Sequence, residues 1–469
     1  MQETLILGRD YKQKVEEVRQ LLLESKDKDQ SDNGTESLVF VDDVFNNFKG
    51  KDGKFLEDVK QDVRGLMALY EAAQLGFNGE TIIDEAQELS RLHLSGYLHQ
   101  NHENLCCQRE AITNTLTHPQ HKTIPRLSSA KSLLDGDHHL LKGSKVWEKS
   151  LRELVNMNFL IAKSLHQDEL LQVSKWWKEL GLGEKLPKAR NQAVKWYTWS
   201  MASISDPRLS FQRIELTKSI AFIYLIDDIF DLYGTIHELT LFTQAINRWD
   251  DTATSMLPEY MRMSYKALVD TTNEIAHNIH KKHGHNPINA LKATWASLCD
   301  AFLVEARWFA SGELPTAEEY LKNGKVSTGV HVVIVHLFFL LGLGGLNHEI
   351  NLNDTSKFTS SIAAILRLWD DFGSSKDEHQ DGQDGSYITC YMKDEPNVSA
   401  KQARRRVVDL ISNEWRNLNQ ECFRLNHFSA ACFKRSSLNI ARMVPLMYAY
   451  NENQRLPLLE EYMRSTLFD

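Results

Sequence analysis

Apolar residues recur at intervals of three and four positions along most of this 469-residue chain, which is the spacing of one helix face. The pattern runs from Val44 to about Leu116 and resumes from Leu151 onward. Alternating apolar and polar runs bounded by turns, which mark β-strands, are scarce. The 10 prolines and 23 glycines are few for this length and also disfavour turn-rich β folds. We therefore predict an all-α fold.

Two breaks in this periodicity suggest how the chain is divided. The segments THPQHKTIPR at 117–126 and DGDHHLLKGSK at 135–145 interrupt the helical pattern and favour loops. Helix hairpins precede them, and helices of 12 to 25 residues with short turns follow. We predict an N-terminal α-helical domain over 1–160 and a C-terminal α-bundle domain over 161–469. Bundles commonly build metal and ligand sites from inward-facing side chains.

Charge and targeting signals restrict the partners and the compartment. The net charge of −9 opposes binding to nucleic acid and to anionic lipid. The six cysteines form no CxxC pair, which fits a reducing compartment. Residues 3–29 mix seven acidic with six basic side chains, unlike an acid-poor transit peptide, so we predict a cytoplasmic protein. We also expect a monomer.

The most apolar stretch runs from Val330 to Leu346. It is short for a membrane span, and two histidines and three glycines interrupt it. It therefore predicts a helix of the protein core, and we expect no membrane span.

Three carboxylates follow an apolar run in SIAFIYLIDDIFDLYGT at 219–235. On a helix, Asp227 and Asp231 share a face and lie about 6 Å apart along the axis, with Asp228 beside them. Like charges at this spacing repel, and burial next to large apolar residues is costly unless a cation compensates. Mg²⁺ suits this role because it takes oxygen ligands and is shared with substrate phosphates. Taken alone, however, this segment favours a solvated helix end where the acids merely face water.

A second acidic segment changes that balance. In AAILRLWDDFGSSKDEHQDGQDGSY at 363–387, Asp370, Ser374 and Glu378 stand at i, i+4 and i+8. On a helix, all three project from one stripe. Two helices that each run from an apolar into an acidic stretch can face each other across a bundle and hold divalent ions. The pair therefore predicts a magnesium site.

These acidic segments resemble the metal motifs of a known family. DDIFD at 227–231 and DDFGSSKDE at 370–378 are similar to the DDxxD and (N/D)DxxSxxxE motifs of plant class I terpene synthases. The likeness extends from about residue 43 to the C-terminus. RNQAVKWYTW at 190–199 and ARMVPLMYAY at 441–450 resemble the subfamily that makes acyclic tertiary alcohols, the linalool and nerolidol synthases. The resemblance implies a large α-bundle catalytic domain after a smaller, here shortened, α-helical domain.

The resemblance also implies a role for individual residues. Asp227 and Asp231 would bind two of three Mg²⁺ ions with Asp228 in support, and Asp370, Ser374 and Glu378 would hold the third; Mn²⁺ is an alternative metal. Arg190 and Arg367 match arginines that grip the substrate diphosphate. Guanidinium groups pair bidentately with phosphate oxygens and stay charged at working pH.

Further residues match the family's hydrocarbon pocket. Trp199 and Tyr448 correspond to lining positions, where a ring face can stabilise a carbocation. Ser327 and Thr328 resemble the helix break where backbone oxygens approach the cation, and 378–385 resembles a loop that closes over diphosphate. Ordinary core aromatics and a plain helix kink are the alternatives.

The sequence departs from the family pattern in three places. Arg190-Asn191-Gln192 stands where the family usually has Arg-x-Arg, and the same glutamine variant is found in the acyclic-alcohol subfamily. No tandem arginine followed by tryptophan, which assists cyclisation in the wider family, is present near the N-terminus. The span before residue 43 is shorter than is typical. The first two departures favour an open-chain product.

We therefore predict a Mg²⁺-dependent lyase that ionises geranyl or farnesyl diphosphate, releases diphosphate and quenches the allylic cation with water to linalool or nerolidol. Preorganised charges would stabilise the developing diphosphate anion. The alternatives are a cyclising terpene synthase, a chain-elongating prenyltransferase, which would use a second DDxxD, and a non-catalytic α-helical scaffold.

Overall fold

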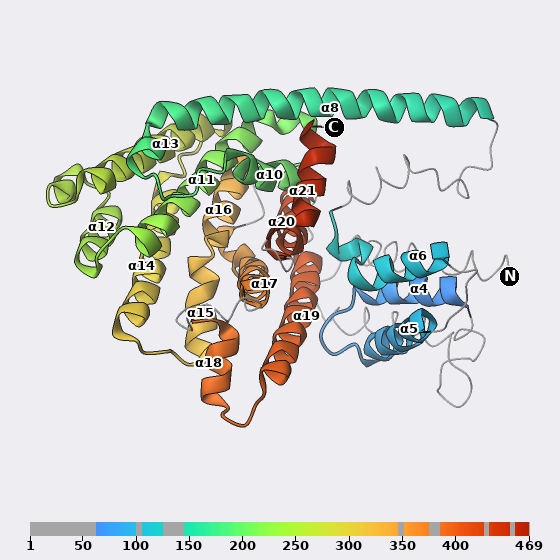
Figure 1. Cartoon of the computed structure of the whole chain (residues 1–469). Helices are drawn as coiled ribbons and strands as arrows, with labels where there is room; N and C mark the ends of the chain where they lie inside the picture. Colours follow the sequence, from blue (N-terminus) through green and yellow to red (C-terminus); the bar gives the residue numbers. More distant parts are fainter. Residues whose placement is uncertain are drawn as a thin grey trace, which may run out of the picture. The chain divides into compact units, whose positions relative to one another are not determined.

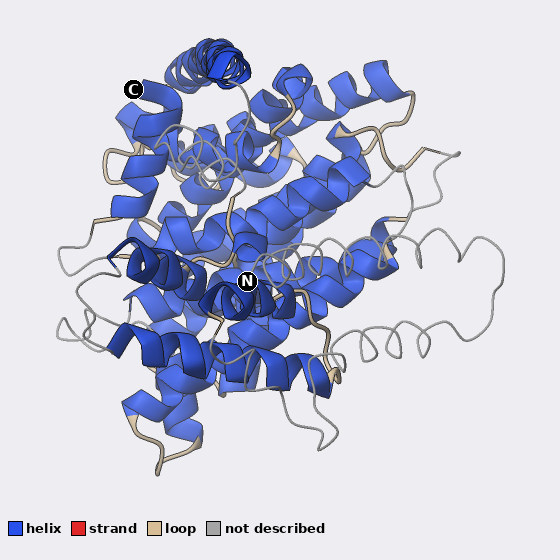
Figure 2. Cartoon of the chain, turned by 90° about the vertical axis from the view of Figure 1, so that its right-hand side faces the viewer, coloured by secondary structure: helices blue, strands red, loops and turns tan. Residues whose placement is uncertain are grey.

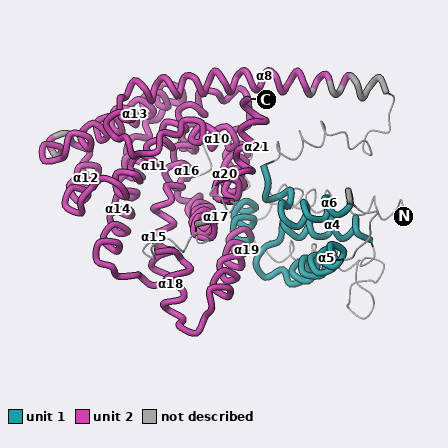
Figure 3. The backbone as a smooth tube through the Cα atoms, in the orientation of Figure 1, with its two compact units in different colours: residues 1–129, 416–426 teal, residues 130–415, 427–469 magenta. Residues whose placement is uncertain are grey.

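The structure is a computed structural model of the chain, and it describes residues 62–99, 106–124, 145–345, 351–374, 385–425, 431–450 and 455–468. Over these ranges every regular element is a helix (Figures 1 and 2), which confirms the all-α prediction. The chain divides into two compact units: residues 1–129 with 416–426, and residues 130–415 with 427–469 (Figure 3). The domain boundary predicted near residue 160 stays a prediction; that position lies inside a helix of the second unit.

The first unit contains three described α-helices and one 3-10 turn: α4 (Val63–Ala73), α5 (Thr81–His99), α6 (Cys106–Thr117) and η1 (Gln120–Lys122). Asp62 caps α4 by accepting a hydrogen bond from the backbone of Arg64 (3.1 Å), which satisfies one free amide of the first turn. The core joins all three α-helices through Leu66 and Tyr70 of α4, Leu94 of α5 and Ile112 of α6. Each of these helices thus buries its apolar face in a shared core.

The helices of the second unit, in chain order, are as follows. They are α8 (Lys145–Leu180), α9 (Leu182–Lys185), α10 (Ala193–Ser203), η3 (Pro207–Leu209), α11 (Ser210–Leu232), α12 (Ile236–Arg248), η4 (Asp251–Thr254), α13 (Glu259–His283), α14 (Ile288–Ser311), α15 (Ala317–Ser327), α16 (Val330–Leu340), η5 (Leu352–Thr355), α17 (Ser356–Ser374), α18 (Tyr387–Asp394), α19 (Ala400–Arg424), α20 (Ala431–Tyr448), α21 (Pro457–Met463) and η8 (Arg464–Phe468). The last residues of α19 belong to the first unit.

Five of these helices form a closed ring that positions the acidic segments. α11 packs on α16, α16 on α17, α17 on α20, α20 on α10, and α10 returns to α11. The acids predicted to bind metal lie at the C-terminal ends of α11 and α17. Arg190 precedes the start of α10, and Tyr448 ends α20. Residues distant in the sequence are therefore carried by neighbouring helices of one ring.

The most apolar stretch forms α16, and nine of its 11 residues are buried. One segment, Ala317–Leu340, is long and apolar enough to cross a membrane by composition, yet 72% of its apolar window is buried within the described structure. This is the expected behaviour of a core helix. The predicted extent of 330–346 is wrong at its end: the helix stops at Leu340 because Gly342 and Gly344 adopt positive φ angles of 83° and 89°.

The junction of α15 and α16 depends on Gly329, which has a φ of 69°. A Cβ atom there would lie 2.7 Å from Cγ2 of Ile223 on α11. We expect Gly329→Ala to cost about 2 kcal/mol or more, because it adds a clash to the left-handed penalty of about 1 kcal/mol. Gly312→Ala is the matched control, since Gly312 has a φ of 70° and open space around it. Equal losses of thermal stability in the two variants would contradict this account of the junction.

Candidate active site

The acids of α11 lie in its last two turns because the helix is stopped immediately after them. The backbone N–H of Gly234 donates to the carbonyl of Ile229 (2.9 Å), and Thr235 starts α12 with a capping box. Asp227, Asp228 and Asp231 therefore stand at the negative end of the helix dipole. Carboxylates are disfavoured at this end unless a positive charge is close by.

Arg190 supplies positive charge to two of these acids. Its backbone N–H and Nε donate to the two oxygens of Asp228, at 2.6 and 2.7 Å, and its Nη2 pairs with Asp227. Burial alone would lower the pKa of Arg190, but the charges of Asp227 and Asp228 outweigh it and raise the pKa above its ordinary value. The side chain of Asp228 is only 4% exposed, and both of its oxygens accept hydrogen bonds from Arg190.

The acids of α17 are divided between two tasks. Asp371 is buried and accepts hydrogen bonds from the hydroxyl of Tyr320 (2.8 Å) and from the backbone N–H of Tyr387 (2.9 Å). Burial raises its pKa to about 7. It therefore ties α17 to α15 and α18. Asp370 is the residue before Asp371 on the helix, and it interacts electrostatically with Asp227 of α11.

That interaction is electrostatic and connects the two motifs. Burial raises the pKa of Asp370; the charge of Arg367 opposes this effect, and the charge of Asp227 raises the pKa further. Asp231 behaves similarly. Partial burial, and then the charge of Asp227, raise its pKa to about 7, and the rest of its side chain is exposed to solvent. The charges of acids on α11 and α17 thus affect one another within one region.

This donor set fits a magnesium ion. The oxygens are hard ligands, they repel one another, and they lie at the C-terminal ends of two helices. Among the described residues, no three acidic, histidine or cysteine side chains are already grouped to hold a metal. Mg²⁺ typically completes its shell with waters and substrate phosphates, so a partial set is sufficient. Ser374 ends α17, and Glu378 lies outside the described residues.

Arg367 lies one turn before Asp370 and is held by a polar network at the break between α15 and α16. Its Nη2 donates to the hydroxyl of Ser327 (2.7 Å) and lies 3.5 Å from Oε1 of Glu305 on α14. Ser327 in turn donates to Glu305 at 2.6 Å. Thr328 follows and donates to the carbonyl of Lys325 (3.1 Å). The predicted residues Arg367 and Ser327 are therefore in direct contact.

Aromatic side chains lie next to the acids. Nε1 of the buried Trp199 donates to the hydroxyl of Tyr224 (3.2 Å), and the guanidinium of Arg190 lies 4.8 Å from the centre of the Tyr224 ring. Burial, and then the charges of Tyr224 and Asp370, raise the pKa of Tyr448 well above its ordinary value. Trp199 and Tyr448 thus approach the region of the acids from α10 and α20.

Sequence reasoning missed three residues of this region. Tyr224 stands one turn before Asp227 and Asp228 on the same face of α11, so helical spacing was the signal for it. Glu305 is a single acid in an apolar part of α14 and belongs to no motif. Asp371 was visible in the sequence, but only the structure shows that it turns to Tyr320 rather than to the other acids.

Comparisons with known proteins identify the family of this chain. Residues 178–417 match the family model described as terpene synthase family, metal binding domain, and residues 39–116 match terpene synthase, N-terminal domain. The chain therefore belongs to the terpene synthase family. It is a lyase, and its class of chemistry is the metal-dependent ionisation of a prenyl diphosphate.

Three related proteins show what the chain resembles in sequence. A tricyclene synthase of Antirrhinum majus, named as chloroplastic, is 54% identical over 91% of this chain and 73% of its own length. An (E)-nerolidol synthase of Cannabis sativa is 46% identical over 91% of this chain and 76% of its own length. The chloroplastic S-(+)-linalool synthase of Arabidopsis thaliana is 45% identical over 90% of this chain and 74% of its own length.

A solved structure supports the predicted metal. Isoprene synthase from grey poplar, in complex with three Mg²⁺ ions and dimethylallyl-S-thiolodiphosphate, has a TM-score of 0.82 and 28% identity to this chain. The match covers 99% of this chain and 90% of that one. Together with the metal-binding domain, this confirms the predicted fold, family and magnesium dependence.

Proposed function

We propose that Asp227 and Asp231 on α11, and Asp370 on α17, are the magnesium ligands of this terpene synthase, with Ser374 and Glu378 completing the second set. The observation that carries the proposal is that α11 and α17, which both end in these acids, belong to one ring of packed helices. Burial, and in addition the charge of Asp227 on the other helix, raise the pKa of Asp370. Asp228 acts in support, because it fixes the backbone and side chain of Arg190. Bound Mg²⁺ would supply positive charge to the leaving diphosphate.

Arg190 and Arg367 hold the diphosphate in this proposal. Arg190 pairs with Asp227 and Asp228 here, so substrate binding exchanges part of that pairing for phosphate oxygens. Arg367 is kept extended by Ser327 and Glu305, and Gly324 leaves room for its stem: a Cβ there would lie 3.0 Å from Cγ of Arg367. Positioned cations of this kind stabilise the charge that develops as the allylic C–O bond breaks.

The hydrocarbon chain of the substrate lies against aromatic side chains. In this proposal Trp199 and Tyr448 face the cation that remains after diphosphate leaves. Ser327 and Thr328 lie at the helix break next to Arg367. Ring faces stabilise a cation without offering it a nucleophile. Water then attacks C3 of the allylic cation and loses a proton to the released diphosphate, which gives a tertiary alcohol.

We propose linalool from geranyl diphosphate and (E)-nerolidol from farnesyl diphosphate as the products. Two observations support acyclic alcohols: Gln192 replaces the second arginine of the usual motif, and relatives named linalool and nerolidol synthase are 45% and 46% identical. A cyclising synthase is the second candidate, because the tricyclene synthase relative is more similar, at 54% identity.

A product assay separates these candidates. Purified protein is incubated with Mg²⁺ and each diphosphate in H₂¹⁸O, and the products are analysed by gas chromatography and mass spectrometry. We expect acyclic tertiary alcohols that carry the ¹⁸O label. Cyclic hydrocarbons as the main products would overturn the acyclic proposal, and soluble folded protein that releases no diphosphate from either substrate would favour a scaffold.

The compartment is a separate proposal. Relatives from Antirrhinum majus and Arabidopsis thaliana are named as chloroplastic. The cytosolic location of this chain stays a prediction. Import of the chain, fused to a fluorescent protein, into isolated chloroplasts would contradict this. The monomeric state also stays a prediction.

A further inference from the structure

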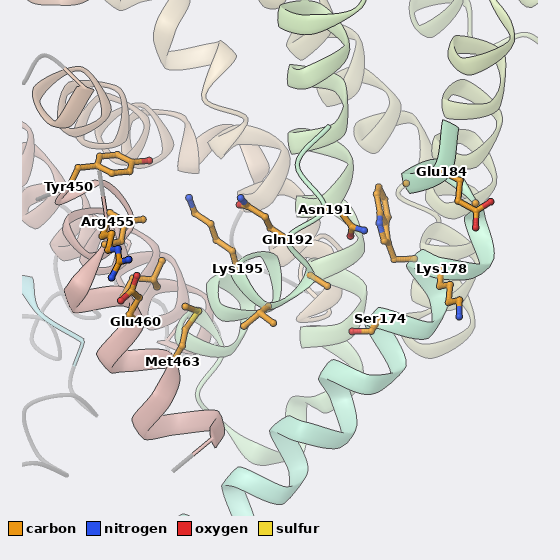
Figure 4. Close-up of a pocket in the computed structure, with 17 residues that line it drawn as sticks. Ser174, Lys178, Glu184, Asn191, Gln192, Lys195, Tyr450, Arg455, Glu460 and Met463 are labelled. Atoms are coloured by element: carbon orange, nitrogen blue, oxygen red, sulfur yellow. The ribbon is translucent and has the colours of Figure 1, made fainter. Parts of the chain in front are cut away.

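A cavity of about 990 Å³ opens beside Arg190, between α8, the start of α10 and the C-terminal segment that contains α21 (Figure 4). Gln192 and Lys195 line it from the start of α10, and Tyr450 lines it from the segment after α20. Figure 4 shows the side chains of Gln192 and Lys195 extending into it in the same direction. None of these three residues contacts the substrate in the function proposed above.

Lys195 carries a positive charge into the region of the acids without a partner of its own. Its Nζ lies 5.9 Å from the centre of the Tyr224 ring. The guanidinium of Arg190 lies 4.8 Å from the centre of the same ring. Arg190 has two carboxylates as partners, whereas Lys195 forms no hydrogen bond or ion pair with any described residue. Two cations therefore share one aromatic ring, and only one of them is neutralised.

Lys195 is close enough to Arg190 and to Asp370 of α17 for both charges to affect its pKa. Burial and the charge of Arg190 lower the pKa of Lys195, and the charge of Asp370 raises it. Tyr450, on the wall of the same cavity, lies close to the acidic end of α17, since a Cβ atom at Gly373 would lie 3.3 Å from Cδ2 of Tyr450. The inner end of the cavity thus reaches the place where the proposed function puts the diphosphate. An anion there would relieve the repulsion between the two cations.

We propose that Lys195 is a second cationic contact for the diphosphate group, beside Arg190, and that it replaces the guanidinium that Gln192 lacks. Lys195 extends from the turn of α10 that follows Gln192, so both side chains serve the same end of the helix. This inference rests on the proposed function, because it concerns the same substrate group. It adds a substrate-binding residue that no motif identifies.

The test measures binding of inorganic diphosphate in the presence of Mg²⁺ by calorimetry, with the full chain. We expect Lys195→Met to bind about tenfold more weakly than the unmodified protein and to depend less steeply on salt, because one screened charge contact is lost. Lys195→Arg should retain binding, and Gln192→Arg should restore it in the Lys195→Met background. Lys178→Met is the matched control: Lys178 lines the opposite side of the cavity, points away in Figure 4, and its loss should leave binding unchanged.

The outcomes are decisive in each direction. Unchanged affinity and salt dependence in Lys195→Met would overturn the inference. Weaker binding that neither Lys195→Arg nor the added Gln192→Arg corrects would also overturn it, since the loss would then come from altered structure. Failure of the proposed function is distinguishable, because the unmodified protein would then neither bind inorganic diphosphate nor release it from prenyl diphosphates.

Discussion

Asp227→Asn is expected to reduce Mg²⁺-dependent diphosphate release by a factor of at least about 100, and Asp370→Asn by a similar factor. Each variant removes a carboxylate that helps to neutralise charge on the leaving group through the metal, and losing one such preorganised contribution typically costs 10²- to 10³-fold. The rate is measured by a coupled diphosphate assay under saturating substrate. Asp270→Asn, at an exposed acid of α13, is the control and should stay within about twofold of the unmodified protein.

The double variant tests whether the two acids act on a shared metal cluster. Residues that act as one unit give strongly non-additive losses. We therefore expect Asp227→Asn with Asp370→Asn to be little worse than either change alone. Losses that multiply would contradict a common cluster. In addition, Mg²⁺ with diphosphate should raise the Tm of the unmodified protein, because the ligands bind the folded state, and should raise that of the variants much less.

Arg213→Met is expected to destabilise the second unit by about 3–5 kcal/mol. Arg213 and Glu169 form a buried ion pair between α11 and α8, with side chains 0% and 1% exposed. Removing one partner leaves an uncompensated buried charge, which is the costly case for such pairs. Glu169 also accepts a hydrogen bond from Tyr197 of α10 (2.8 Å), so the pair joins three helices. We expect Tm to fall on the order of 5–10 °C by differential scanning calorimetry.

The matched control for this change is Arg208→Met. Arg208 pairs with Asp206 at 2.7 Å, close to the 2.6 Å of the buried pair, but its side chain is 87% exposed. Exposed pairs contribute little to stability, so the control should shift Tm by about 2 °C or less. Equal shifts of Tm in the two variants would show that burial does not determine how much these ion pairs contribute to stability. Below its transition, Arg213→Met should retain diphosphate release, since Arg213 lies outside the candidate active site.

The sequence identifies the residues of the site best where charge is repeated along a helix. Asp227 and Asp231, and then Asp370, are visible because their spacing on a helix face follows from its geometry, and helices of one ring carry them to one region. Tyr224, Glu305 and Lys195 leave no such pattern. Each is a single polar or aromatic residue whose role depends on which helix packs opposite it, and that is decided by tertiary packing.

The ends of the helices are also harder to predict from the sequence than the helices themselves. α8 runs for 36 residues, longer than the 12 to 25 predicted, because no glycine or proline interrupts Lys145–Leu180 and it stops only where Gly181 adopts a φ of 66°. α16 ends earlier than predicted because Gly342 and Gly344 leave helical geometry after Leu340. Composition favours a helix, and the conformation of individual glycines decides where that helix stops.

A crystal structure of the protein with Mn²⁺ and inorganic diphosphate would show whether α11 and α17 hold one metal cluster, because anomalous scattering locates each metal ion independently. The account predicts ions bound by Asp227 or Asp231 on one side and by Asp370, Ser374 and Glu378 on the other, all sharing oxygens of one diphosphate. Ions bound only to acids outside α11 and α17, or two ions that share no diphosphate, would contradict it.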